Sequence, residues 1–381
     1  MRRWKQISAC CLAAVLAAGP AGTAWAGSPE FARTAEEWAR LRDNVMEYDE
    51  LAGLIHEYNV TVHNNQVDYN KKRQDGDVTS DEIAQAYRDA ADEYWSEIDG
   101  EDPVSDAGKR ASARQAEKSA DNNVEDLTVY RMTYDQTEAN LVAAAQTAMI
   151  SYFQQQLQLQ SAKEGRDLLE AVYNSTVVRL NAKMATQVEV LTAEENLRNA
   201  DTSIHKLEAS IEETRQNLCV MLGWKYNDQP EIKSIPEVDM ARIEAMDLEA
   251  DKQKALANNY TLNINKRKYD NAQSQSTKET LQKTISDNEQ KIGADMTKNY
   301  QAVLQNRLAY EQAVAELNLE SKNMASAEIK FQNGLISRLE YQQQQNTFSG
   351  KQIAVQTASL NLFQAVQTYD NAVNGLASTG G

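Results

Sequence analysis

The sequence has 381 residues, a formal charge of −17 and 25% charged residues, with only five prolines and fifteen glycines. So few helix-breaking residues favour long uninterrupted helices over an ordinary globular core. The strong negative charge disfavours a nucleic-acid-binding surface, because the neutralisation of phosphates needs a basic face.

The first 26 residues are typical of a secretory signal peptide. A basic start, an apolar segment over residues 7–18 and an A-x-A cleavage site at residues 24–26 follow one another. We therefore expect residues 1–26 to direct export to the cell envelope. After cleavage Cys219 would be the only thiol, which excludes an intramolecular disulfide. No later segment has eighteen consecutive apolar residues, so no membrane-spanning helix is expected.

Two long helical blocks follow, separated by a linker that contains two prolines. Apolar residues recur at helical spacing through both blocks. In the first block we predict helices over residues 34–73, 80–98, about 106–181 and 187–222. In the second block we predict a helix from about 239 to 332, bent near 272–290, and a helix over residues 337–375.

The two blocks are internal repeats of different length. A shift of 200 residues pairs Asn59 with Asn259, whereas a shift of 151 residues superposes the later helices, and the difference of 49 places an insertion in the first repeat. The predicted segments are a signal peptide over 1–26, a first repeat over 27–222 with its insertion near 74–123, a linker over 223–236, a second repeat over 237–376 and a disordered tail over 377–381.

Each repeat ends in a helix with a seven-residue apolar period. Such a period, kept over four positions, is typical of a coiled-coil seam, because an isolated helix would drift away from it. We predict an oligomer seam formed by Leu197, Ile204, Ile211, Leu218, Phe348, Val355, Leu362 and Tyr369.

A second, narrower stripe of mostly small residues runs along the same helices. Its members are Ala193, Ala200 and Leu207 in the first repeat and Ala358, Ala365 and Ala372 in the second. Small residues let neighbouring helices approach closely, and two stripes are one more than a single partner needs. We therefore expect helices packed side by side in a ring or a sheet-like wall.

The reversal between the last two helices of each repeat has a specific chemistry. Asn333-Gly334 can end one helix, because Gly334 can adopt a positive φ. Ser337 can cap the next helix, with Glu340 completing a capping box. Thr186 and Glu189 reproduce this box in the first repeat, although Lys183 stands where the glycine would be.

Together these features resemble the TolC family of outer-membrane efflux channels. The helical tip of that family follows a pattern close to R-F-x-x-G-L-x-x-x-x-D-V, and residues 179–190 and 330–341 follow it without a gap. Asn59 and Asn259 resemble the family's N-terminal helix signature, and residues 218–224 resemble the end of its first repeat. The resemblance covers nearly the whole chain after residue 26.

The resemblance implies a tunnel of coiled helices built from three protomers. It also implies that the helical tips meet a periplasmic adaptor and, with it, an inner-membrane ABC or proton-driven transporter. The candidate adaptor-contacting tip residues are Lys183, Thr186, Glu189, Phe331, Gly334, Ser337 and Glu340.

The sequence departs from the family where the family inserts two β-strands per repeat. Residues 272–278 lack an alternating apolar run, and residues 80–98 have helical spacing. We therefore predict an all-α fold. It consists of long antiparallel coiled-coil hairpins in two tandem repeats, forming a TolC-like helical tunnel without β-barrel strands.

No catalytic, cofactor-binding or metal site is predicted, and the chain is not expected to be an enzyme. Residues 75–83 imitate half of an EF-hand loop, but Lys71 and Arg73 would repel calcium, so a helix capped by Thr79 with Glu82 is favoured. His56 and His63 are seven residues apart, which is not the spacing of a zinc-binding helix.

The sequence thus predicts an exported channel subunit that assembles as a homotrimer in a tripartite efflux or secretion system. The resemblance places it at the outer membrane, although we do not expect it to insert into a bilayer by itself. The alternative is a coiled-coil scaffold or spacer of the cell envelope that conducts nothing.

Overall fold

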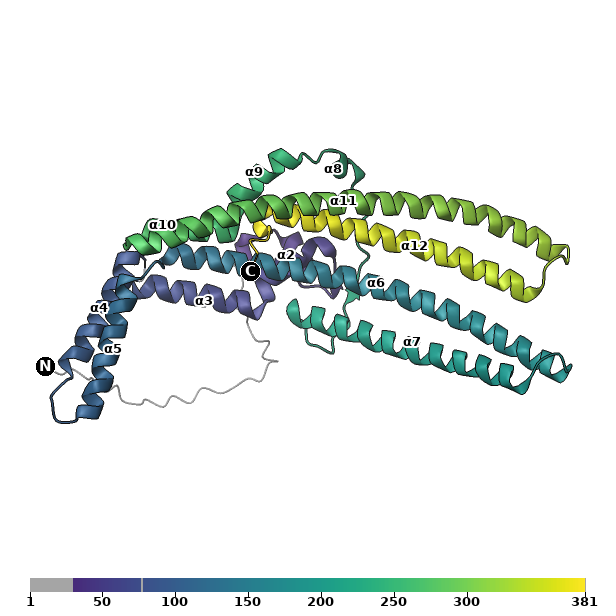
Figure 1. Cartoon of the computed structure of the whole chain (residues 1–381), viewed down its shortest axis with the longest axis horizontal. Coiled ribbons are helices and arrows are strands. Elements are labelled where there is room, and N and C mark those ends of the chain that lie inside the picture. Colours follow the sequence, from purple (N-terminus) through teal and green to yellow (C-terminus); the bar gives the residue numbers. More distant parts are fainter. Residues whose placement is uncertain (1–29, 77, 381) are drawn as a thin grey trace.

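The computed structural model describes residues 30–76 and 78–380, which form an elongated and almost entirely helical molecule (Figure 1). The first repeat contains α1 (Ala35–Leu41), α2 (Leu51–Tyr58), α3 (Val60–Asp75), α4 (Ser80–Ser96), α5 (Pro103–Asp121), α6 (Leu127–Asn181) and α7 (Gln187–Met221). The second contains α8 (Met240–Glu244), α9 (Leu248–Asn258), α10 (Tyr260–Asn271), α11 (Gln275–Gln332) and α12 (Arg338–Asn371). The predicted all-α fold is confirmed. The predicted signal peptide lies outside the described residues.

Strands contribute little to this molecule. Among the described residues only β1 (Val45–Met46) and β2 (Glu231–Ile232) are strands, and they form one parallel pair. Val45 lies opposite Glu231 and Met46 opposite Ile232. This pair attaches the linker between the repeats to the beginning of the first repeat.

The four longest helices form a single-layered wall. Helix α12 packs along both α11 and α6, and α7 packs along the other side of α6, so the order across the wall is α11, α12, α6, α7. Viewed down the shortest axis of the molecule, these helices lie side by side, and both hairpin reversals are at the same end (Figure 1). The expected sheet-like arrangement of helices is therefore present.

The predicted helix over residues 34–73 is wrong as one element, because it is broken into α1, α2 and α3. The 3-10 turn Tyr48–Glu50 follows β1, and Asn59 then separates α2 from α3. Asn59 has an extended backbone, and its side chain accepts hydrogen bonds from the backbone N–H groups of Thr61 and Val62. An asparagine in this conformation starts a new helix.

The predicted helix over about 106–181 is likewise two helices, α5 and α6. Asp126 ends the break with an extended backbone, and its side chain accepts a hydrogen bond from the N–H of Val129 at 2.7 Å. In the second repeat the expected bend is a break between α10 and α11, where Ser274 caps α11 by accepting from the N–H of Thr277. In both places a short polar side chain competes with the helical backbone.

Each repeat is held together by an equivalent asparagine. The side-chain amide of Asn59 donates to the backbone carbonyl of Met221 at 2.9 Å. The amide of Asn259 donates to the carbonyls of Gly375 at 3.2 Å and Ala377 at 2.8 Å. Both asparagines also cap the helix that follows them. Each thus ties the first helices of its repeat to the end of its last helix.

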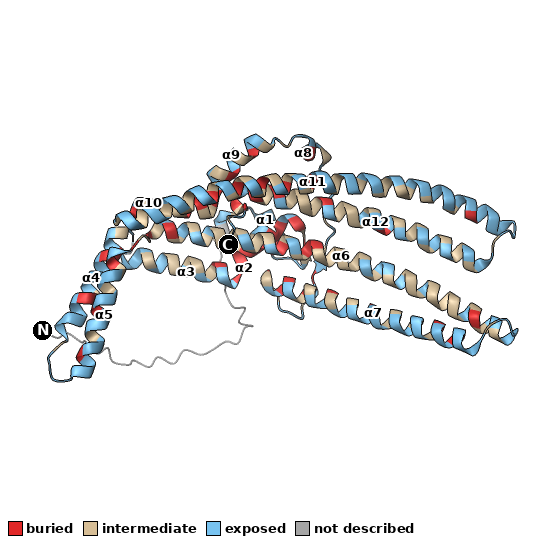
Figure 2. Cartoon of the chain, viewed as in Figure 1, coloured by how far each residue is buried: buried red, intermediate tan, exposed pale blue. Residues whose placement is uncertain are grey.

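The buried residues gather near the middle of the molecule (Figure 2). One hydrophobic cluster belongs to the first repeat and is centred on α2, α6 and the end of α7, and the other belongs to the second repeat and is centred on α9, α11 and α12. Toward the reversals the four wall helices are mostly exposed or half-buried (Figure 2). Among the described residues, no second layer of helices covers that part of the wall.

The predicted oligomer seam requires a correction. Five of its eight residues are buried within the protomer, and Leu197, Phe348 and Val355 are half-buried. The burial arises because α7 packs along α6 and α12 packs along α11 and α6. The seven-residue period thus serves the hairpins of one chain at Ile204, Ile211, Leu218, Leu362 and Tyr369.

The expected disordered tail is also corrected for residues 377–380. Ala377 is buried, and its carbonyl accepts the hydrogen bond from Asn259. The N–H of Ser378 donates to the carboxylate of Asp295 at 2.9 Å. These contacts fix the end of the second repeat against α10 and α11.

Candidate functional site

The two reversals at the end of the wall have the same backbone geometry. In the second repeat the N–H of Leu335 donates to the carbonyl of Lys330 at 2.8 Å, and the N–H of Gly334 donates to the carbonyl of Phe331 at 3.0 Å. This pair of bonds is a Schellman motif, which satisfies the last carbonyls of α11. In the first repeat Met184 and Lys183 donate in the same way to the carbonyls of Arg179 and Leu180.

Both motifs need a residue with positive φ. Gly334 has a φ of 68°, and Lys183 has a φ of 59°, the one positive φ among non-glycine residues of the described chain. A side chain in this conformation strains the backbone. The first reversal thus keeps the geometry of the second at an energetic cost.

The two predicted capping boxes are present. The hydroxyl of Thr186 accepts from the N–H of Glu189, whose carboxylate accepts from the N–H of Thr186. Ser337 and Glu340 exchange the same bonds. The backbone hydrogen bond to Thr186 holds the pKa of Glu189 below its usual value, and that to Ser337 does so for Glu340. Both carboxylates are therefore charged at neutral pH.

All seven predicted tip residues are exposed. They lie on two separate hairpin tips, with Lys183, Thr186 and Glu189 on one and the other four on the second. The ring of Phe331 stacks on that of Tyr341, with centroids 4.6 Å apart. No described contact joins one tip to the other. The structure therefore has two similar, separate hairpin tips at one end of the wall, each of which we call a knob.

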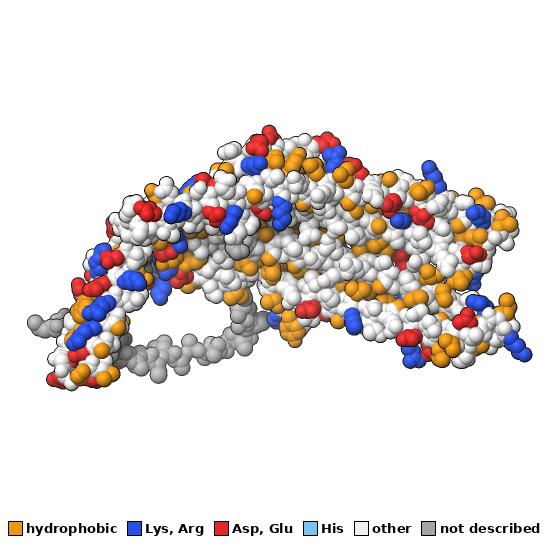
Figure 3. Space-filling model, viewed as in Figure 1, with side chains coloured by type: hydrophobic (Ala, Val, Ile, Leu, Met, Phe, Trp, Pro, Cys, Tyr) orange, Lys and Arg blue, Asp and Glu red, His pale blue; other side chains and the backbone are white. Residues whose placement is uncertain are grey.

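Exposed apolar residues on these tips were not among the predicted site residues. Met184 is 69% exposed and Leu335 is 73% exposed. Val178 and Ile329, one turn before the reversals, are exposed as well. Figure 3 shows hydrophobic side chains at the surface of both tips. The shift of 151 residues pairs Val178 with Ile329 and Met184 with Leu335, and this pairing was the signal available in the sequence.

The strained lysine gives a stability prediction. We expect Lys183→Gly to raise the free energy of unfolding by about 1 kcal/mol, because glycine removes the αL strain. Gly334→Ala should lower it by about 1 kcal/mol, since no atom lies within 4 Å of an added Cβ and only the backbone strain remains. Urea denaturation of both variants measures these changes, and equal effects of the two substitutions would contradict the assignment.

A polar pocket of about 510 Å³ lies between α3 and α6, far from the tips. Its lining includes Asn65, Tyr69, Arg73, Arg131, Tyr134 and Asp135. At one side His56 Nδ1 lies 2.8 Å from Oε1 of Glu138, and this hydrogen bond raises the pKa of the imidazole. Burial raises the pKa of Asp135.

The hydrogen bond between His56 and Glu138 predicts that the stability of the fold depends on pH. Because its folded pKa is raised, His56 stabilises the folded state fully below its unfolded pKa of about 6.5, and this stabilisation is lost as pH rises through the folded pKa. Glu57 favours the imidazolium as well, while burial and Arg33 oppose it. We expect His56→Gln to lower the denaturation midpoint more at pH 5.5 than at pH 9. A loss that does not change with pH would contradict the pairing.

Neither a metal centre nor a membrane-spanning helix was found in the described chain. Across residues 30–76 and 78–380, the His, Cys, Asp and Glu side chains form no group of three that could hold a metal ion. No helix of this part of the chain combines the length and apolar character needed to cross a membrane. The predicted helix cap at Thr79 is confirmed, since Thr79 and Glu82 form a capping box.

Comparison with known proteins identifies the fold. No protein-family model matches the chain, and no curated protein matches it in sequence. Solved structures resemble it over most of their length, including the following two. A membrane protein from Pseudomonas aeruginosa matches with a TM-score of 0.54 and 13% identity, covering 88% of this chain and 91% of its own. The CmeC outer membrane channel of Campylobacter jejuni matches with a TM-score of 0.52 and 10% identity, covering 90% and 88%.

These likenesses establish the class of architecture. The chain shares the helical repeat fold of these two proteins. It is the TolC-like fold that the sequence predicts, with α6–α7 and α11–α12 as the two long hairpins.

Proposed function

We propose that the chain is one of three identical subunits of a tubular export channel in the cell envelope. In this proposal the channel belongs to a tripartite efflux or secretion system, and its substrates are small molecules or proteins. A periplasmic adaptor and an inner-membrane transporter are its partners. The observation that carries the proposal is a single-layered helical wall of TolC-like fold whose outermost helices, α11 and α7, are largely exposed toward the reversals, beyond the part of α11 on which α8 and α9 pack.

The α11 edge of this wall supports assembly. Its exposed apolar residues are Leu304, Leu308, Ala315 and Leu319. Steps of four, seven and four residues place them on one face of the helix. Leu308 is 66% exposed and Leu319 is 62% exposed. A monomer rarely exposes a continuous apolar stripe, so the stripe indicates an interface.

The opposite edge offers a complementary surface. Val188, Leu191 and Val220 are exposed on α7, and Val60 and Val67 are exposed on α3. An edge that differs from the one it binds gives a head-to-tail contact, which closes into a ring when the rotation fits. The proposed tube is a ring of walls of this kind. The hairpin tips would then form one rim of the tube, and the three protomers of TolC-family channels favour a ring of three.

The tips support the choice of an adaptor as partner. Each combines exposed apolar residues with a charged carboxylate at the first turn of a helix, where the positive end of the helix dipole stabilises it. Three subunits would present six such knobs on one rim. A knob with an apolar centre and a charged rim is the usual composition of a protein-binding surface.

Charge reversal at the tips tests this proposal. The pair Glu189→Lys and Glu340→Lys should lower adaptor binding at least tenfold, because it reverses the sign of both knobs. The pair Glu189→Gln and Glu340→Gln should bind nearly as well, since glutamine can still complete each capping box. Binding is measured by pull-down of the adaptor with purified channel, and export is measured in cells.

Helicity and assembly mass serve as controls for both pairs. Lysine at these positions also loses the capping box, at a cost of about 1 kcal/mol per helix. A loss of adaptor binding is assigned to the reversed charge only where the circular dichroism and the mass of the assembly are unchanged. Wild-type binding and export by the lysine pair would remove the tips from the mechanism.

A further inference from the structure

Helices α4 and α5 form a hairpin that stands apart from the rest of the molecule. The two helices bury Ile83, Ala84, Ala91, Ala113 and Ala120 against each other, and neither packs extensively on another helix. The hairpin projects from the end of the wall opposite the tips and runs at an angle to the wall helices (Figure 1). It occupies the insertion that lengthens the first repeat.

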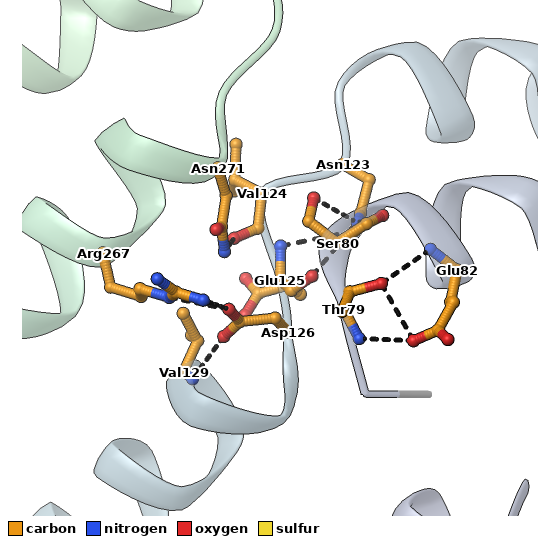
Figure 4. A network of polar contacts seen from close by, with 10 residues as sticks. All are labelled: Thr79, Ser80, Glu82, Asn123, Val124, Glu125, Asp126, Val129, Arg267 and Asn271. Atoms are coloured by element: carbon orange, nitrogen blue, oxygen red, sulfur yellow. Dashed lines mark hydrogen bonds and ion pairs between the residues drawn. The ribbon is translucent and has the colours of Figure 1, made fainter. Parts of the chain in front are cut away.

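A polar network holds the base of this hairpin in place (Figure 4). Asn123, just after α5, donates to the carbonyl of Ser80 at 2.9 Å. The carboxylate of Asp126 is buried and accepts from Arg267 of α10 at 2.7 Å. Asn271 donates to the carbonyl of Val124 at 2.9 Å. The hairpin is thus joined to both repeats, which gives it a defined direction.

Charge is divided unequally between the two sides of the hairpin. Residues 80–102, which are α4 and the loop after it, contain nine acidic side chains and one basic side chain. Residues 103–121, which are α5, contain three acidic and four basic side chains. One side of the hairpin is therefore strongly negative and the other slightly positive.

Several of these charges lack a partner within the described chain. Arg114 and Lys118 are exposed on α5, and neither forms an ion pair with any described residue. Asp92 and Glu93 of α4 are exposed, and the described residues supply no cation to their carboxylates. Free charges of opposite sign on two sides of one element are complementary to a second copy of that element.

The hairpin also extends in a suitable direction. In the view down the shortest axis it begins beside α10 and crosses the end of the molecule toward the side on which α3 and α7 lie (Figure 1). In a ring of walls that side adjoins the next copy. The hairpin thus reaches toward the neighbouring subunit and, with it, toward the neighbour's hairpin.

We propose that the α4–α5 hairpins of neighbouring copies bind one another, with the acidic α4 side of one against the α5 side of the next. The contact is head-to-tail, so three copies would close it into a collar at the end of the tube opposite the tips. This inference rests on the proposed ring of subunits. Exposed ion pairs are individually weak, so the collar orders the hairpins while the wall edges hold the ring together.

Cysteine cross-linking between copies tests the collar. In a Cys219→Ser background, Ser96→Cys and Gln115→Cys place thiols on exposed outer sides of α4 and α5. Ser96 is about 140° around α4 from the buried Ala91, and Gln115 is about 160° around α5 from the buried Ala113. The two thiols therefore face away from each other in one hairpin. With a short bismaleimide, covalent dimers and trimers should form only when the hairpins of different copies meet.

Charge reversal identifies the contact. Adding Arg114→Glu and Lys118→Glu should lower the cross-linked fraction at least fivefold, and adding Asp92→Lys and Glu93→Lys as well should restore it. Lys225→Glu, a reversal of an exposed lysine in the linker between the repeats, should leave cross-linking unchanged. The mass of the uncross-linked assembly should stay that of the ring in every variant.

The outcomes separate the collar from the ring. An intact ring without cross-links between copies overturns the collar and leaves the proposed function standing. A monomer in the uncross-linked control overturns the ring, and the collar with it. Cross-linking that is insensitive to both reversals overturns the charge pairing. In cells, cross-links from the hairpin to another protein, in place of a second copy, overturn the collar in favour of a foreign partner.

Discussion

Replacing Gly223 by alanine is expected to lower the free energy of unfolding by about 3 kcal/mol or more. Gly223 follows α7 with a φ of 93°, and an added Cβ would overlap the Cβ of Tyr58 and lie 3.3 Å from its backbone oxygen. Backbone strain of about 1–2 kcal/mol would add to overpacking of about 1–3 kcal/mol. The loss is measurable as a shift of the urea midpoint.

The second repeat contains the same joint at Gly375. Its φ is 116°, and an added Cβ would lie 2.7 Å from the backbone oxygen of Asn258. Residue 58 and residue 258 are equivalent under the shift of 200 residues. In both repeats the glycine after the last helix therefore packs against the equivalent residue of an early helix. Gly375→Ala should therefore lower the free energy of unfolding about as much as Gly223→Ala does.

Two glycines inside the long helices provide matched controls. Gly165 in α6 and Gly293 in α11 have no atom within 4 Å of an added Cβ. Alanine at either position should raise stability by up to about 1 kcal/mol, because it favours the helix. A Gly223→Ala variant as stable as Gly165→Ala would show that the joint with Tyr58 is not formed.

The second large effect concerns assembly. Leu308→Lys with Leu319→Lys should convert the ring into monomers at micromolar concentration, because two charges would be buried at each interface. The folded monomer should keep its helicity, since both side chains are exposed in the single chain. Light scattering and circular dichroism measure the two properties.

A control of the same chemistry lies in the linker between the repeats. Tyr226 is 63% exposed and belongs to neither wall edge. Tyr226→Lys should leave the mass of the assembly unchanged. A leucine double variant that still assembles as the wild type would place the interface away from α11.

Much of the fold could be predicted because local chemistry determines it. The second reversal was predictable from Gly334, Ser337 and Glu340, since a glycine that permits positive φ and a capping box act within a few residues. The first reversal was predictable only by analogy between the repeats. Lys183 does not itself favour positive φ, and the surrounding helices impose it.

Two features could not be predicted because they depend on residues far away in the sequence. These are the positions of the helix breaks and the helices that pack on the seven-residue apolar stripe. Asp126 could be one acidic residue of a continuous helix, and the partner that fixes it, Arg267, lies in the other repeat. The seven-residue period identifies an apolar face without saying which helix covers it. The structure shows that α6 and α11 do so for Ile204, Ile211 and Leu362.

The sequence predicted where the tip residues lie, but it did not predict the exposed apolar residues among them. Glu189 and Glu340 lie where the pattern places them, each in the first turn of its helix. The only sequence signal for the exposed Met184 and Leu335 was their pairing under the shift of 151 residues, and their exposure itself depends on where the neighbouring helices lie. The charge division of the α4–α5 hairpin was visible in the sequence, but its isolation from other helices was not.

The central claim is that single-layered walls close into a tube of three chains. Electron microscopy of the purified protein tests it most directly, because the images show both the number of subunits and the path of the helices. We predict a closed ring of three copies, with the α11 edge of each against the α3–α7 edge of the next and six hairpin tips on one rim. A well-folded monomer at micromolar concentration, or an assembly in which the α11 stripe stays exposed, would contradict the claim.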